Sequence, residues 1–94
     1  MSAKFKEETD QIHRVINNPD HWIRWSEHAE LRMEQYGHTA EDVIEALRTG
    51  IVLRVDVMDD VVYRVRGTNI DGEKLEVAAA VYERIVTIKI ITVI

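Results

Sequence analysis

The sequence has 94 residues, a formal net charge of -5, 46% hydrophobic residues and no cysteine. A chain of this length buries one hydrophobic core, and its apolar content is too high for a disordered segment. The lack of cysteine excludes a disulfide framework and thiolate metal sites. Its acidity argues against general polyanion binding, which depends on Lys and Arg neutralising phosphates. We expect one cytoplasmic domain over residues 1–94, and no membrane span because the apolar stretch at residues 85–94 is too short.

The first predicted element is a helix over residues 3–16 with a weak apolar stripe of Phe5, Ile12, Val15 and Ile16. It must end at Asn17-Asn18-Pro19, because proline disfavours helical geometry in the residue before it. We interpret residues 1–18 as an appended helix that precedes a core of residues 22–93. That core opens with the aromatic, alternating residues 22–25, which are typical of a short edge strand.

Two short helices are predicted next. Ser26 is a suitable N-cap for a helix over residues 26–36, Gly37 supplies a left-handed residue to end it, and its apolar face is formed by Trp25, Ala29, Met33 and Tyr36. The other helix begins at the capping box of residues 39–42 and ends at Gly50, with an apolar stripe of Ala40, Val43, Ile44 and Leu47. Because the turn between them is so short, we expect the two helices to form a compact pair.

After Gly50 the hydrophobic period changes to two, which indicates strands. Turns are expected at Asp59-Asp60 and at Asp71-Gly72, and the last strand at residues 85–93. The inward-facing residues are expected to be Ile51, Leu53, Val55, Val57, Val61, Tyr63, Val65, Leu75, Val77, Ala79, Val81, Val86, Ile88 and Ile90. Four sequential strands with short turns favour an antiparallel meander. The predicted fold is α+β, with two or three N-terminal helices packed on one face of this sheet.

The opposite sheet face would carry more basic than acidic residues: Arg54, Asp56, Arg64, Arg66, Lys74, Glu76, Ala78, Ala80, Tyr82, Thr87 and Lys89. A positive face on an acidic protein suits an anion, and Ala78 with Ala80 would leave room above the sheet. Tyr82 is placed to stack on a base. The expected RNA- or anion-binding residues are Arg54, Arg66 and Lys74. The ordinary alternative is a solvent-facing sheet in which pairs such as Arg64 with Glu76 stabilise the strands.

His28 and Arg32 stand four residues apart on a predicted helix, so their side chains lie on one flank of it. Cleavage of RNA through its own 2′-hydroxyl needs a proton carrier and positive charge near the phosphate, and a His–Arg pair supplies both without a metal. In the structural alternative, His28 bonds a backbone carbonyl and Arg32 pairs with nearby acids. The histidines show no metal-ligand spacing, and the sequence has no Gly-rich phosphate loop, so we expect neither a metal nor an organic cofactor.

The stretch W-S-E-H-A-E-L-R-M at residues 25–33 resembles the signature of a small prokaryotic family known only as a domain of unknown function. The family reads H-A-x-x-R-M, then a Gly turn, a short capped helix, and strands with Y-R-V and D-G. The matches, within residues 22–93, are His28, Ala29, Arg32, Met33, Gly37, Asp42-Val43, Gly50, Tyr63-Arg64-Val65 and Asp71-Gly72. In element order the family is similar to the BrnT and RelE groups of toxin–antitoxin ribonucleases.

The resemblance implies a cytoplasmic bacterial toxin-like domain that cleaves RNA without a metal and is covered by an antitoxin protein. In that role His28 would carry the proton, Arg32 and Arg64 would hold phosphate, and Lys89 and Tyr82 would assist. Whether the chain is an enzyme is left open by the residues themselves.

A competing hypothesis is a non-enzymatic interaction module that forms a homodimer, or binds a protein partner, through the last strand. Ile85, Ile91 and Ile94 give that strand an apolar edge with few charges. The charge composition favours this second hypothesis, whereas the motif favours the first.

Overall fold

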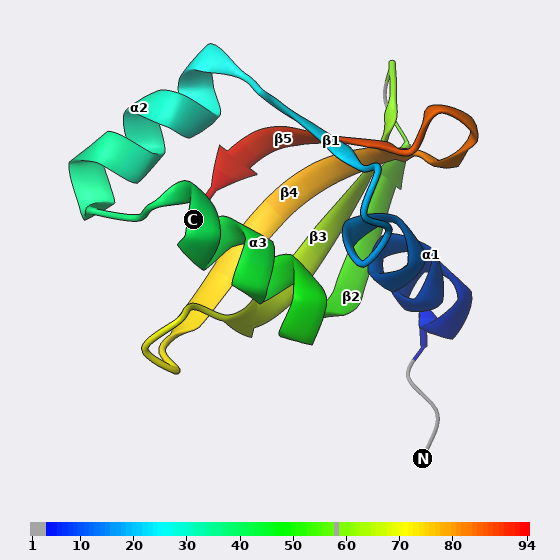
Figure 1. Ribbon diagram of the computed structural model, residues 1–94, viewed down its shortest axis with the longest axis horizontal. Coiled ribbons are helices and arrows are strands. Elements are labelled where there is room, and N and C mark those ends of the chain that lie inside the picture. The colour runs from blue at the N-terminus through cyan, green and yellow to red at the C-terminus, as the bar shows by residue number, and fades with distance from the viewer. Residues whose placement is uncertain (1–3, 58) are drawn as a thin grey trace.

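The structure is a computed structural model that describes residues 4–57 and 59–94 (Figure 1). Its helices are α1 (Lys6–Ile16), α2 (Glu27–Tyr36) and α3 (Ala40–Thr49). Its strands are β1 (Trp22–Trp25), β2 (Ile51–Val57), β3 (Val61–Thr68), β4 (Lys74–Tyr82) and β5 (Thr87–Val93), with a 3-10 turn, Glu83–Ile85, before β5. The fold is α+β, while the expected helix start at residue 3 lies outside the described residues. Within the described ranges, no helix is long and apolar enough to cross a membrane.

The five strands form one sheet in the order β1-β5-β4-β3-β2. The antiparallel meander expected from the sequence runs from β2 to β5, and the short edge strand expected at residues 22–25 is β1. Because β1 runs parallel to β5, the sheet is mixed and has five strands instead of four antiparallel ones. The expectation of a free edge on the last strand is also corrected, since β5 lies between β4 and β1.

The helix ends follow the capping residues in the sequence. The Ser26 hydroxyl accepts a hydrogen bond from the Ala29 N–H at 3.0 Å, and the capping box between Thr39 and Asp42 is complete. Gly37 ends α2 in the left-handed conformation, with φ of 71°. These local signals need no tertiary contact, which is why they could be predicted.

All three helices pack on one face of the sheet and share its hydrophobic core (Figure 1). The helix α1 is part of that core and not an appendage, because three of its residues are at most 2% exposed: Ile12, Val15 and Ile16. Two polar side chains of α1 also form hydrogen bonds to the backbone at the start of β2. The Thr9 hydroxyl accepts from the Val52 N–H at 2.9 Å, and His13 Nε2 lies 2.8 Å from the Gly50 carbonyl oxygen. The first turns of α1 are polar, so the sequence showed only a weak stripe.

A β-bulge between Val52 and Arg54 changes which residues of β2 face the core. Val52 is 3% exposed, whereas Ile51 and Leu53, which were expected to point inward, are 46% and 38% exposed. A bulge inserts one residue into the ladder and shifts the alternation by one position. From Arg54 onward the residues lie on the expected faces, but Val57 and Val61 at the turn between β2 and β3 are 78% and 47% exposed and do not enter the core as expected.

The strand β5 begins two residues later than expected, because the chain makes a tight turn first. The turn Glu83–Ile85 is followed by Val86 in the left-handed region, with φ of 49°. This conformation is strained for a β-branched residue. The carbonyl oxygen of Val86 accepts a hydrogen bond from the Trp22 N–H at 2.9 Å, so the turn also starts the pairing of β1 with β5. Val86 therefore belongs to the turn and not to the strand, but it packs against the core as its expected inward position implied.

Candidate functional site

One face of the sheet lies opposite the three helices, and we call it the open face. The strand registers bring every residue that was expected on this face to it, so the predicted alternation is confirmed there. Arg64 lies level with Ala78, and Lys89 lies level with Ala80. The parallel pairing of β1 adds two residues to the same face that the sequence had not assigned to it, Trp22 and Arg24.

Three arginines of the open face are already paired with acidic neighbours. Arg54 lies 3.0 Å from the Asp56 carboxylate. Glu76 lies 3.1 Å from Arg66 and 4.0 Å from Arg64. The Arg64 Nε is buried and has no hydrogen-bond partner in the described part of the chain. The charged residues of the open face on β2 and β3 are therefore largely used in ion pairs within the sheet, as the ordinary alternative expected.

The space expected above the small residues of β4 is absent. Ala78 is 6% exposed and Ala80 is 1% exposed, although both belong to the open face. Their neighbours in the register are the longer side chains of Arg64 and Lys89, whose stems can cover the alanines while their charged ends stay in water. The middle of the open face is consequently closed, and a ligand would have to bind on top of it.

The residues Trp22, Arg24, Tyr82 and Lys89 form a group at the β1 side of the open face, which we call the cationic patch. Arg24 is level with Lys89 on the adjacent strand, which places their chains about 5 Å apart. Thr87 lies between the two aromatic residues, in register with Trp22 on one side and Tyr82 on the other. Within residues 4–57 and 59–94, neither Arg24 nor Lys89 forms an ion pair. The patch thus combines two unpaired cations with two aromatic rings.

Tyr82 marks the limit of the cationic patch toward the acidic turn before β3. Burial and the neighbouring Asp60 carboxylate raise the pKa of Tyr82, while the Arg24 charge opposes them. The phenol is protonated at neutral pH, as in an ordinary tyrosine, and the raised pKa makes its loss of a proton still less favourable, so Tyr82 can donate a hydrogen bond there. Trp22, by contrast, is 72% exposed and presents its ring to solvent.

The helix α2 carries the two residues of the predicted His–Arg pair. Arg32 donates a hydrogen bond from Nη1 to the Tyr36 hydroxyl at 3.0 Å, and its guanidinium carbon lies 5.7 Å from the centre of that ring. His28 is exposed. In the described residues, no hydrogen bond or ion pair joins His28 or Arg32 to Arg64, Lys89 or Tyr82. The backbone-bonded His28 and acid-paired Arg32 of the structural alternative are not seen there either.

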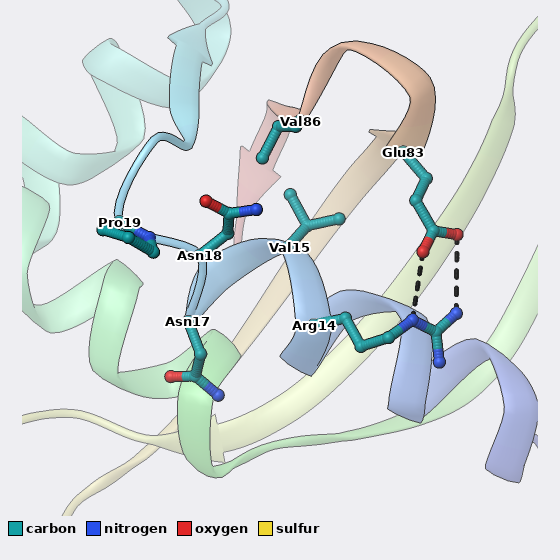
Figure 2. Close-up of a pocket in the computed structure, with 7 residues that line it drawn as sticks. All are labelled: Arg14, Val15, Asn17, Asn18, Pro19, Glu83 and Val86. Carbon is teal, nitrogen blue, oxygen red and sulfur yellow. Dashed lines mark hydrogen bonds and ion pairs between the residues drawn. The ribbon is translucent and has the colours of Figure 1, made fainter.

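A separate pocket of about 500 Å³ lies between the C-terminal end of α1, the loop of residues 17–19 and the turn before β5 (Figure 2). Figure 2 shows Arg14 and Glu83 joined across one wall, with an N···O distance of 3.0 Å. The Arg14 guanidinium holds the pKa of Glu83 below its ordinary value. The side-chain oxygen of Asn18 accepts from the Asp20 N–H. Because these polar groups are already engaged, the pocket offers little chemistry, and nothing in the sequence pattern indicated it.

Comparison with known proteins identifies a family for this chain but no individual similar protein. The family model described as Domain of unknown function (DUF4258) matches residues 25–94. No curated protein and no solved structure matches the chain. No group of three or more His, Asp or Glu side chains placed to hold a metal occurs in the part of the chain that the structure describes. Of the cationic patch, Tyr82 and Lys89 lie inside the matched region, whereas Trp22 and Arg24 precede it.

Proposed function

Since the chain belongs to the DUF4258 family, whose description assigns no function, we propose one from the geometry: the protein binds single-stranded RNA at the cationic patch. The observation that carries this proposal is the parallel pairing of β1 with β5, which sets Arg24 beside Lys89 without an acidic partner in the described residues. Two adjacent cations suit the phosphates of a nucleic-acid backbone.

The aromatic residues of the cationic patch favour single-stranded over double-stranded nucleic acid. Bases stack on exposed aromatic rings only when they are unpaired, and such stacking combined with a cationic track is typical of proteins that bind single strands. Trp22 offers the exposed ring, and the protonated Tyr82 offers a ring and a hydrogen-bond donor. The net charge of -5 repels RNA at long range, but physiological salt screens this repulsion beyond about 8 Å, so the two cations of the patch decide the contacts of a docked strand.

We extend the proposal to metal-independent cleavage of the bound RNA by a bacterial toxin-like domain of the BrnT and RelE type. His28 is the proposed proton carrier, Arg32 and Arg64 hold phosphate, and Lys89 and Tyr82 assist. The proposed supporting contacts to RNA come from Arg54, Arg66 and Lys74. An antitoxin protein is the proposed partner that covers the open face. The support for this extension is the H-A-x-x-R-M stretch together with the shared face of Arg64, Lys89 and Tyr82. His28 and Arg32 belong to α2, which packs on the other face of the sheet, so an RNA strand on the open face reaches them only by passing around the edge formed by β1.

Binding is tested by the fluorescence anisotropy of a labelled single-stranded RNA at low and at raised salt concentration. The double variant Arg24→Glu/Lys89→Glu should weaken binding at least about tenfold and flatten the salt dependence, because each phosphate contact contributes about 0.7 to the slope. The matched control is Lys6→Glu/Arg48→Glu, which changes the net charge equally at exposed positions on α1 and α3. Equal losses in both double variants would contradict a local site.

The aromatic part of the cationic patch is tested separately with Trp22→Ala. Loss of one stacked base should cost about 1–3 kcal/mol of binding free energy and leave the salt slope unchanged. The intrinsic fluorescence of the two tryptophans gives a control. Trp25 packs against the core, so its emission should not change when RNA binds, whereas the emission of the exposed Trp22 should. An unchanged affinity of Trp22→Ala would remove stacking from the proposal.

Cleavage is tested by incubating RNA with the protein in the presence of a chelator and examining the products for 2′,3′-cyclic phosphate ends. The variant His28→Ala should abolish cleavage while it preserves binding. In a bacterial host, expression of the wild type should slow growth and degrade RNA, and Arg64→Ala should relieve both effects. Intact RNA and unaltered growth with the wild type would refute cleavage and leave the binding proposal to its own test.

A further inference from the structure

The strand β2 is the outermost strand of the sheet on the side of α1 (Figure 1). Its inner side is paired with β3. On its outer side, α1 binds only the start of the strand, through the contacts of His13 with Gly50 and of Thr9 with Val52. No side-chain hydrogen bond reaches the backbone of residues 53–57 in the described chain. A five-residue segment of free strand edge therefore remains.

The free segment of β2 has only part of the protection that is usual for an edge strand. A β-bulge lies at its start and it carries the charges of Arg54 and Asp56, but it contains neither Lys nor Pro. Their apolar side chains are instead accessible: Val57 is 78% exposed and Leu53 is 38% exposed. Val61, which is level with Val57 on β3, is 47% exposed. The edge is thus both open and apolar.

The charges of the free segment are arranged symmetrically about its centre, Val55. Two antiparallel copies of a strand related by a two-fold axis place residue n−k of one copy opposite residue n+k of the other. An axis at Val55 sets Arg54 opposite the Asp56 of the second copy, on the same face of the sheet, and forms two opposite-charge pairs. An axis at Arg54 or at Asp56 would place like charges opposite each other, which is unfavourable.

We propose that the protein forms a two-fold symmetric homodimer by antiparallel pairing of residues 53–57 of β2 with the same segment of a second copy. The Arg54–Asp56 ion pair, with an N···O distance of 3.0 Å in the single chain, becomes half of a ring of four alternating charges. Leu53 of each copy comes level with Val57 of the other, and both lose exposed apolar surface. The two five-stranded sheets become one continuous sheet.

The other edge of the sheet does not offer the same symmetry. An axis at Ile23 would place Trp22 opposite Arg24, and an axis at Arg24 would place two arginines opposite each other, so no opposite-charge pair forms there. Pairing through β2 also leaves the cationic patch accessible, because β4, its strand nearest to β2, lies two strand spacings away, or about 10 Å. Dimer formation and RNA binding share only Arg54, which is a proposed supporting contact to RNA. The RNA test therefore uses Arg24 and Lys89, and the dimer test is read as mass without RNA, so either property can fail without the other.

The dimer is tested by light scattering and sedimentation of the full chain over a dilution series. The wild type should approach twice the monomer mass of 10.9 kDa at high concentration. The variant Arg54→Asp places acid against acid and should weaken self-association at least about tenfold. The swapped variant Arg54→Asp/Asp56→Arg restores both opposite-charge pairs and should restore the dimer. A wild type that stays monomeric, or an Arg54→Asp variant that dimerises as well as the wild type, would overturn the proposal.

Two controls separate the dimer from a general effect on folding. Arg48→Asp reverses another exposed charge, one that pairs with Glu45 on α3, and should leave the mass unchanged. Amide hydrogen exchange of the wild type locates the interface without a substitution. Exchange in residues 53–57 should slow as the protein concentration rises, while exchange in β1 should not change. Concentration-dependent protection at β1 instead of β2 would also overturn the proposal.

Discussion

At the residue scale, Thr9 connects α1 to the edge of the sheet through one buried hydroxyl. It is 7% exposed, and its oxygen accepts the hydrogen bond of the Val52 N–H. The substitution Thr9→Val keeps the side-chain shape but leaves that buried N–H without a partner, so the free energy of unfolding should fall by about 1–3 kcal/mol. Chemical denaturation measures this change.

The control for Thr9→Val is Thr9→Ser, which removes a methyl group and keeps the hydroxyl. Its loss of stability should be smaller than that of Thr9→Val. Equal losses in the two variants would show that packing, and not the hydrogen bond, holds α1 at this edge.

A second prediction at the residue scale concerns the pH dependence of stability. Hydrogen bonds from the Thr39 and Ile70 backbones and the Thr39 side chain hold the pKa of Asp42 below its ordinary value, although desolvation opposes them. A carboxyl whose pKa is lower in the folded state stabilises the protein above its unfolded pKa and loses that effect as pH falls through the folded pKa. The stabilisation by Asp42 should therefore be full at neutral pH, begin to fall near about pH 4 and disappear only below the lowered pKa of the folded protein.

The comparison of the wild type with Asp42→Asn isolates this effect. The variant should melt at a lower temperature than the wild type at pH 7, and the difference should shrink as the pH falls below about 4. Thermal melts monitored by circular dichroism measure both. A difference that is constant over the whole pH range would mean that the Asp42 charge does not contribute.

At the element scale, α3 lies very close to the sheet, and Gly67 permits the approach. A Cβ at Gly67 would stand 2.0 Å from the Ala46 carbonyl oxygen, which is backbone and cannot rotate away. Gly67→Ala should therefore push α3 from β3 and lower the free energy of unfolding by about 1–3 kcal/mol or more. Gly72→Ala is a useful contrast, because it meets no atom within 4 Å and tests backbone strain alone, at φ of 82°. A Gly67→Ala protein as stable as the wild type would contradict this packing.

The elements that the sequence predicted well are those whose signals are local. The alternation in β3 and β4 gave the correct faces, and the caps at Ser26 and Thr39 gave the correct helix starts. The bulge in β2, the left-handed Val86 and the burial of α1 depend on how distant segments meet, so a short window of sequence does not contain them. The same reason explains why the faces of Arg54, Arg64 and Lys89 were predicted correctly, whereas the space expected above Ala78 and Ala80 is filled.

At the scale of the whole molecule, the candidate site combines segments from near both ends of the described chain. Tyr82 and Lys89 were candidates from their alternation alone, whereas Arg24 joined them only through the parallel pairing of β1 with β5. Next to this pairing, the Ser26 hydroxyl donates to the Ile91 carbonyl at 2.6 Å across a separation of 65 residues. No helical or strand periodicity connects positions so far apart, so this part of the site needed the three-dimensional structure.

The parallel pairing of β1 with β5 also sets the order in which the surface can form during synthesis. Arg24 leaves the ribosome well before its neighbour Lys89, which belongs to β5. A growing polypeptide therefore presents one of the two cations alone until β5 has been made and can pair with β1. If the cationic patch binds RNA as proposed, that affinity should be missing from any nascent chain in which β5 has not yet joined the sheet.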